Sequence, residues 1–187
     1  MTGIGHNLGP SMDEGASWRR HCWQQARREL LPTLPLEVLR LRVARAREIG
    51  LEYRTYATVR ATTGQDIVAF LFSSNALRLF AQRSTLPQDR ADRLAQINSC
   101  GRIALVHRPL TPELVLVPPI DHAFAAPAPA AIWRQVRRDI RAALHDKRLP
   151  AEGVLLIGET AQEREWSGAA ALAGYLSADR FFAACTG

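Results

Sequence analysis

Cysteine is scarce in this chain. Cys22, Cys100 and Cys185 are odd in number and far apart, with no CxxC pair and no Cys/His cluster. Such spacing supports neither a disulfide framework nor a zinc site. The glycine-rich fingerprints GxGxxG and GxxxxGK are missing too, as are the hydrolase patterns HExxH and GxSxG. We therefore expect no metal, no cofactor and no standard enzyme motif.

Long hydrophobic runs are also missing. A membrane-spanning helix needs about 18 or more consecutive apolar residues, and no stretch of this sequence approaches that length. The first residues, MTGIGHNLGPSM, lack the basic and apolar regions of a secretory signal. We expect a protein of the bacterial cytoplasm that does not act in a membrane.

Lysine is almost absent: Lys147 is the only one among 24 lysine and arginine residues. The net charge of +6 and a pI of about 10.0 suit a polyanionic partner such as nucleic acid. A chain rich in arginine and alanine also arises from GC-rich codon usage, whatever its function. The positions of the arginines are therefore more informative than their number.

With 47% hydrophobic and 22% charged residues, the 187-residue chain has the composition of a folded domain. We predict a flexible tail at 1–11, which contains the IGHNLGP segment, a helical hairpin at 12–50 and an α/β core at 51–187. The fold class is α+β or mixed α/β, with the N-terminal helical hairpin followed by a roughly five-stranded sheet and flanking helices.

The stretch 65–80, QDIVAFLFSSNALRLF, has three interpretations. It can be the reading helix of a helix-turn-helix, one long buried helix, or a strand that gives way to a helix. A reading helix contacts bases from its N-terminal end, which here carries only apolar side chains. We predict a strand at 66–73, a β-hairpin partner at 53–62 because of its threonines, valine and tyrosines, and a helix over 76–83.

The remaining elements follow from turn and capping signals. Capping boxes at 85–88 and 160–163 predict helices over about 86–99 and 160–176. Apolar runs predict a second hairpin, with strands at 102–108 and 113–118, and a last strand at 153–159. Residues 123–131 are expected to be a proline-rich connector, 130–147 an amphipathic helix, and 178–184 a final turn.

The clearest surface signal lies in WRQVRRDIRAALHDKR, residues 133–148. Helical spacing places six basic side chains on one side of the helix and the apolar residues on the other. The guanidinium group suits phosphate because of its two-pronged donor geometry. The expected anion-binding or nucleic-acid-binding residues are Arg134, Arg137, Arg138, Arg141, His145 and Arg148; the alternative is a solvated face with local carboxylate partners.

Three residues are candidates for acid–base catalysis. Asp121 and His122 follow a predicted strand, and Glu159 ends the last one. Strand ends in a mixed sheet can converge, which would pair a carboxylate with an imidazole. The segment Ser73-Ser74-Asn75 could instead offer hydroxyls to an anion, or simply cap a helix.

These observations favour a non-catalytic accessory or regulatory protein. It would bind an anionic partner, either nucleic acid or an acidic protein surface, through the arginine-rich helix. One alternative is a protein-interaction module that docks through its N-terminal helices. Another is a small enzyme for a phosphorylated or nucleic-acid substrate, which requires Asp121, His122 and Glu159 to share one pocket.

Overall fold

The computed structural model describes residues 34–183. The chain divides into two compact units, residues 1–39 and 40–187, and the sheet lies wholly in the second. The first described helix, α2 (Leu36–Glu48), corresponds to the helix expected near the end of the helical hairpin. The predicted tail at 1–11 and the first helix of the hairpin lie outside the described residues.

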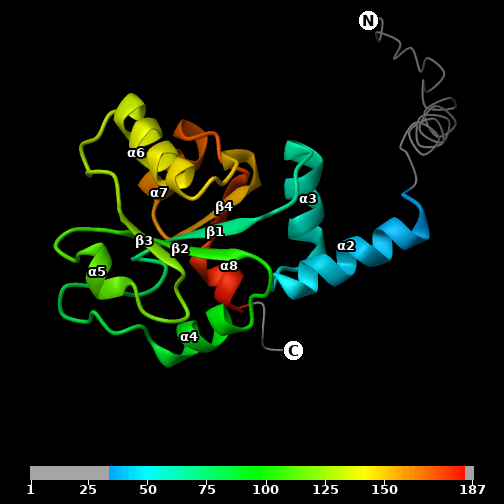
Figure 1. Cartoon of the computed structure of the whole chain (residues 1–187), viewed down its shortest axis with the longest axis horizontal. Helices are drawn as coiled ribbons and strands as arrows, with labels where there is room; N and C mark the ends of the chain where they lie inside the picture. Colours follow the sequence, from blue (N-terminus) through cyan, green and yellow to red (C-terminus); the bar gives the residue numbers. More distant parts are fainter. Residues whose placement is uncertain (1–33, 184–187) are drawn as a thin grey trace, which may run out of the picture. The chain divides into compact units, whose positions relative to one another are not determined.

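The second unit is built around a five-stranded parallel sheet (Figure 1). Its strands are β1 (Ala69–Ser73), β2 (Gly101–Val106), β3 (His122–Ala125), β4 (Val154–Gly158) and β5 (Gly174–Ser177). The order across the sheet is β3-β2-β1-β4-β5. The predicted mixed α/β class is confirmed. Both predicted β-hairpins are wrong, because every neighbouring pair of strands is parallel.

Helices cover both faces of the sheet. Figure 1 shows α6 (Trp133–Asp146) and α7 (Ala161–Ala169) on one side, with α4 (Gln88–Ala95) and α8 (Ala178–Ala183) on the other. The chain therefore leaves β1 towards one face and β4 towards the opposite face, although these strands are neighbours. A doubly wound sheet has its switch point at such a place, and ligands commonly bind at the carboxyl edge there.

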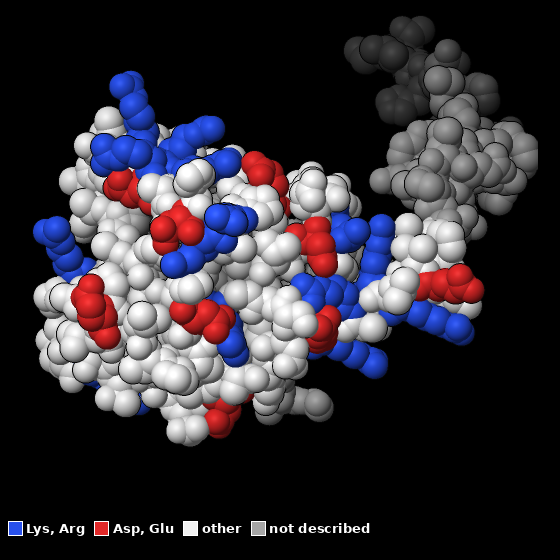
Figure 2. Space-filling view, viewed as in Figure 1, with Lys and Arg blue, Asp and Glu red and all other residues white. Residues whose placement is uncertain are grey.

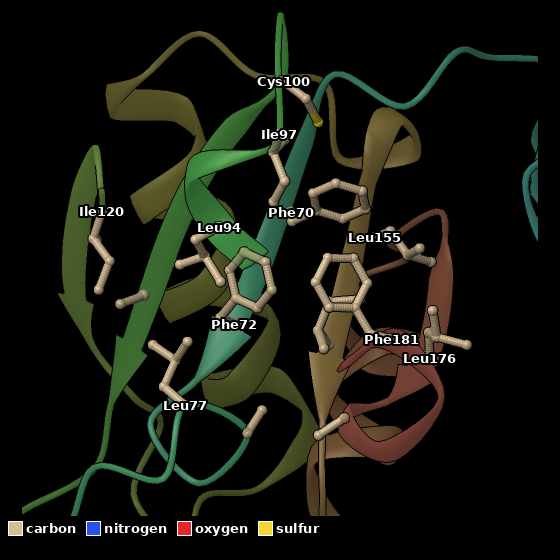
Figure 3. Packing of buried hydrophobic residues seen from close by; sticks show 14 of the residues in the cluster. Phe70, Phe72, Leu77, Leu94, Ile97, Cys100, Ile120, Leu155, Leu176 and Phe181 are labelled. Atoms are coloured by element: carbon tan, nitrogen blue, oxygen red, sulfur yellow. The ribbon is translucent and has the colours of Figure 1, made fainter. Parts of the chain in front are cut away.

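The two sheet faces form separate hydrophobic clusters. On one face, Phe70 and Phe72 of β1 pack against Phe181 of α8 (Figure 3), with ring centroids 5.3 and 5.4 Å apart. On the other, β1, β2 and β4 pack against α6 and α7. Strands β1 and β4 are buried at every position, as their uninterrupted apolar runs predicted. Cys100 belongs to the first cluster, and burial raises the pKa of its thiol to about 12.

Residues 53–62, predicted as a strand, form helix α3 (Tyr53–Thr63) instead. The threonines that suggested a strand make hydroxyl hydrogen bonds within the helix: Thr58 donates to the carbonyl of Arg54, and Thr62 to that of Thr58. Gly64 ends the helix in the left-handed conformation, with φ of 71°. The hydroxyl of the buried Tyr56 donates to Asp66, 2.8 Å away, which fixes the helix against the start of β1.

The predicted strand at 113–118 is also wrong. Pro112 begins the short helix α5 (Pro112–Val115), and of the apolar residues at 114–117 only Val115 is buried in the core, while Leu114 is 58% exposed. The missing strand is β3, which overlaps the start of the segment 123–131 that was interpreted as a connector. Its HAFA sequence has little β-branched character, and it forms a strand because it pairs along β2 at the edge of the sheet.

Three further boundaries differ from the predictions. Residues 76–83 form turns and an isolated bridge rather than a helix, and α4 begins at Gln88 without a side-chain cap. Helix α7 ends at Ala169, and the region predicted as its last turns contains β5. The long stretch 65–80 is therefore a strand followed by a turn, neither a reading helix nor one buried helix.

Among residues 34–183, no helix has both the length and the apolar content to cross a bilayer.

Candidate functional site

Polar side chains from three elements meet at the carboxyl edge of the sheet. Ser74 and Asn75 follow β1, His107 follows β2, and Glu163 lies in the first turn of α7 after β4. Parallel strands place their carboxyl ends at one edge, so residues far apart in sequence become neighbours there. Hydrogen bonds join them in two pairs, Ser74 with His107 and Asn75 with Glu163, and the second pair crosses the switch point between β1 and β4.

Glu163 is the centre of this network, and it is fully buried. One carboxylate oxygen accepts hydrogen bonds from the backbone amides of Glu159 and Thr160, at 2.6 and 2.9 Å. The other accepts from the amide group of Asn75 at 2.9 Å. Thr160 completes the predicted capping box by accepting from the amide of Glu163. The same carboxylate therefore caps α7 and joins the ends of β1 and β4.

His107 is held from several sides. Its Nδ1 lies 2.8 Å from the hydroxyl oxygen of Ser74, which also accepts from the backbone amide of His107. The Ser74 hydroxyl can therefore donate to Nδ1, which places the ring proton on Nε2. Nε2 lies 3.6 Å from Glu163, an electrostatic contact too long for a hydrogen bond. The ring also stacks on Trp166, with centroids 5.4 Å apart.

Burial lowers the pKa of His107, and the negative charge of Glu163 opposes this shift only in part. The imidazole is therefore neutral at neutral pH. Ser74 is only 1% exposed, so its hydroxyl positions the histidine ring and is not accessible as a nucleophile.

A cavity of about 470 Å³ adjoins His107. Its other walls are Arg108, the segment 125–129 at the end of β3, and Asp139 of α6. Strand β3 ends at this segment, where Pro127 and Pro129 lack the amide proton needed to continue the ladder. The proline-rich segment that looked like a linker is thus one wall of a cavity at the carboxyl edge.

Gly158 allows Glu163 to approach the end of β4. A Cβ atom at this position would lie 2.9 Å from the Glu163 carboxylate and 2.8 Å from the ring of Tyr175. We predict that Gly158→Ala lowers the free energy of unfolding by about 2 kcal/mol, because the buried Glu163 carboxylate and the half-buried Tyr175 ring must both move. Chemical denaturation monitored by circular dichroism measures this. Gly168→Ala is the matched control, since a Cβ atom there would lie at an ordinary 3.8 Å from the Trp133 side chain; equal effects of the two substitutions would contradict the prediction.

The structure does not bring together Asp121, His122 and Glu159. Residue His122 begins β3 and is level with Leu156 of β4, three residues before Glu159. Three strand spacings also separate β3 from β4, which amounts to about 14 Å across the sheet. A shared pocket, which the enzyme hypothesis required, is therefore not formed by these three residues.

Asp121 has a structural partner at the opposite edge of the sheet. Its carboxylate accepts two hydrogen bonds from the guanidinium of Arg102, at 2.7 and 3.0 Å. Burial alone would raise the pKa of Asp121, but the hydrogen bonds and charge of Arg102 outweigh this effect and lower it. This pair fastens β3 to β2 at their amino ends.

Helix α6 carries the second candidate surface, the arginine face (Arg134, Arg137, Arg138, Arg141, His145 and Arg148). Its residues Val136, Ile140 and Leu144 are buried against the sheet, as the helical spacing predicted. Figure 2 shows the lysine and arginine side chains gathered over α6, near the top of the view. Beside the helix is a groove of about 620 Å³, whose lining includes four of the six basic residues and Glu152.

The six basic residues are not equivalent. Arg141 donates to the carbonyl of Ala170 at 2.7 Å and lies 3.3 Å from Glu152, while Arg138 pairs with Asp139 at 2.9 Å. Among residues 34–183, the side chains of Arg134, Arg137 and Arg148 make no hydrogen bond or ion pair, and all three are exposed. The face therefore combines cations with local partners and cations that are free to meet a ligand.

No family model matches the chain, and no curated protein or solved structure is significantly similar to it.

The sequence predicts Ser74 and Asn75 as a helix cap or an anion contact and Glu163 as part of a capping box, but it does not connect these residues with His107. The available signal was their position, since each follows an apolar run that forms a strand. A prediction of parallel strands would have placed all of them at one edge. The predicted hairpins are antiparallel, so they placed the carboxyl ends of neighbouring strands at opposite edges of the sheet.

Proposed function

We propose that this protein binds nucleic acid through the arginine face of α6. The observation that supports this most is the set of exposed side chains of Arg134, Arg137 and Arg148, which lack an acceptor within the described residues. Neighbouring guanidinium groups on one helix repel one another, and a phosphate backbone relieves this repulsion while its counterions are released. The proposed role is accessory or regulatory, without catalysis.

Trp133 favours a single-stranded partner. Its side chain is 63% exposed at the start of α6, one helical turn from Arg137. An exposed indole offers a flat surface on which an unpaired base can stack, and adjacent arginines follow the strand's phosphates. Duplex bases are already stacked on one another and cannot use this surface in the same way. An acidic protein surface offers no unpaired base to stack on the indole.

The test compares the full chain with a variant carrying Arg134→Ala, Arg137→Ala and Arg148→Ala. Fluorescence anisotropy with a labelled single-stranded oligonucleotide gives the affinity as a function of salt concentration. We expect the variant to bind about tenfold more weakly or worse, and the slope of log affinity against log salt to become shallower by about 2. Trp133→Ala should weaken binding about tenfold with little change in slope, because stacking releases no counterions.

The matched control carries Arg47→Ala, Arg54→Ala and Arg83→Ala. These arginines are also exposed and lie outside α6, so the net charge falls by the same three units. The control should keep most of the affinity. Equal losses in both triple variants would show that only net charge matters and would overturn the proposal. The proposal is also overturned if the full chain does not bind the oligonucleotide, even if the full chain binds acidic proteins.

A further inference from the structure

The cavity beside His107 lies away from the exposed arginines that carry the nucleic-acid proposal. We propose that it binds a small anionic ligand with a carboxylate or phosphate group, and that His107 and Arg108 are its polar contacts. Its volume of about 470 Å³ suits a small molecule and is too small for a macromolecule. Its position at the carboxyl edge of a doubly wound sheet is one where such folds commonly bind ligands.

Ser74 and Trp166 orient the His107 imidazole before any ligand binds. Ser74 occupies Nδ1, so Nε2, which carries the proton in the neutral ring, is the nitrogen left for a ligand. Its contact with the Glu163 carboxylate, at 3.6 Å, is too long for a hydrogen bond and leaves this N–H available to a ligand oxygen. The Trp166 ring stacks against the imidazole at an interplanar angle of 22°, which restricts its rotation. An N–H donor fixed in this way can bind a ligand oxygen at little cost in conformational entropy.

The charges around the cavity favour an anion. Arg108 is exposed and has no hydrogen bond or ion pair with other described residues. Asp139 is already paired with Arg138, and the carboxylate of Glu163 already accepts three hydrogen bonds. The rest of the lining is alanine and proline, whose side chains carry no charge. One cation without a partner and one histidine donor therefore face the same small space.

Inorganic phosphate and acetate are the probes for a direct test on the full chain. Nuclear magnetic resonance follows the His107 ring signal, identified by its absence from the spectrum of His107→Gln, while chloride keeps the ionic strength constant. We expect saturable shifts with a dissociation constant on the order of 1 mM, as suits a fragment-sized ligand. Saturation by phosphate alone identifies a phosphate group, by acetate alone a carboxylate, and by both a site for small oxyanions in general.

Arg108→Ala should weaken binding about tenfold, since one charge-assisted contact is lost. Because Arg108 is exposed, this substitution keeps the fold, and Arg83→Ala is the control for general charge. Ala128→Trp, which places a bulky side chain in the cavity wall, should abolish the shifts.

The proposal is overturned if neither probe gives saturation at tens of millimolar, or if Arg108→Ala binds like the unmodified protein. The triple variant of the arginine face should bind the probes unchanged. The two proposals can therefore fail separately.

Discussion

Replacing Glu163 with alanine is expected to lower the free energy of unfolding by about 3 kcal/mol. The substitution leaves three N–H groups without their acceptor: the amides of Glu159 and Thr160 and the side-chain amide of Asn75. An unsatisfied buried donor costs about 1–3 kcal/mol, and loss of a helix cap about 1 kcal/mol, with partial relief where water can enter. Urea denaturation of the full chain measures the change.

The matched control is Glu165→Ala, on the same helix but at an exposed position. It should change stability by less than about 0.5 kcal/mol. If the two variants were equally stable, the carboxylate of Glu163 would not be holding the ends of β1 and β4 together. Glu163→Gln should have an intermediate effect, because its amide keeps one acceptor oxygen but places a donor among donors.

Replacing Phe181 with alanine is expected to cost about 4 kcal/mol. Helix α8 is short, with only six residues. Phe181 is nonetheless only 1% exposed, and its ring contacts Phe70 and Phe72 of the central strand edge to face. Loss of a buried aromatic side chain removes this packing and leaves a cavity, for which costs of about 3–5 kcal/mol are usual. Thermal or urea denaturation tests this.

The neighbouring Phe182 provides the comparison, since it is only partly buried. Its ring lies 3.7 Å from the guanidinium carbon of Arg90, a stacking contact on a residue that is itself almost fully buried. We expect Phe182→Ala to cost about 1–2 kcal/mol, from lost area and lost cation–π attraction. A larger loss for Phe182→Ala than for Phe181→Ala would contradict the packing described for α8.

The local sequence was sufficient to predict an element where one physical effect, either hydrophobic spacing or helix capping, determined that element. Continuous apolar runs predicted β1 and β4, which are covered on both faces, and the spacing of Val136, Ile140 and Leu144 predicted the buried side of α6. The box from Thr160 to Glu163 located the start of α7 correctly. Each of these signals is confined to one helix or one strand, so no knowledge of distant residues was needed.

Predictions from the local sequence were wrong where contacts between distant residues decided the conformation. Residues 53–63 have threonines suited to a strand, yet they form a helix that Gly64 ends and that the Tyr56–Asp66 hydrogen bond fastens. Strands β3 and β5 have only four residues each and form because β2 and β4 offer open edges. Intrinsic preferences of about 1 kcal/mol over a short segment are readily outweighed by such pairing and burial.

By itself, the sequence determined the class of the fold, the two central strands and the cationic side of α6, because hydrophobic spacing and charge are properties of single elements. The tertiary structure alone decided that the strands are parallel, and with that the meeting of Ser74, His107 and Glu163 at one edge. It also separated Glu159 from Asp121 and His122. The physical reason is that strand direction depends on which edges pair, a choice made by contacts between residues far apart in the chain.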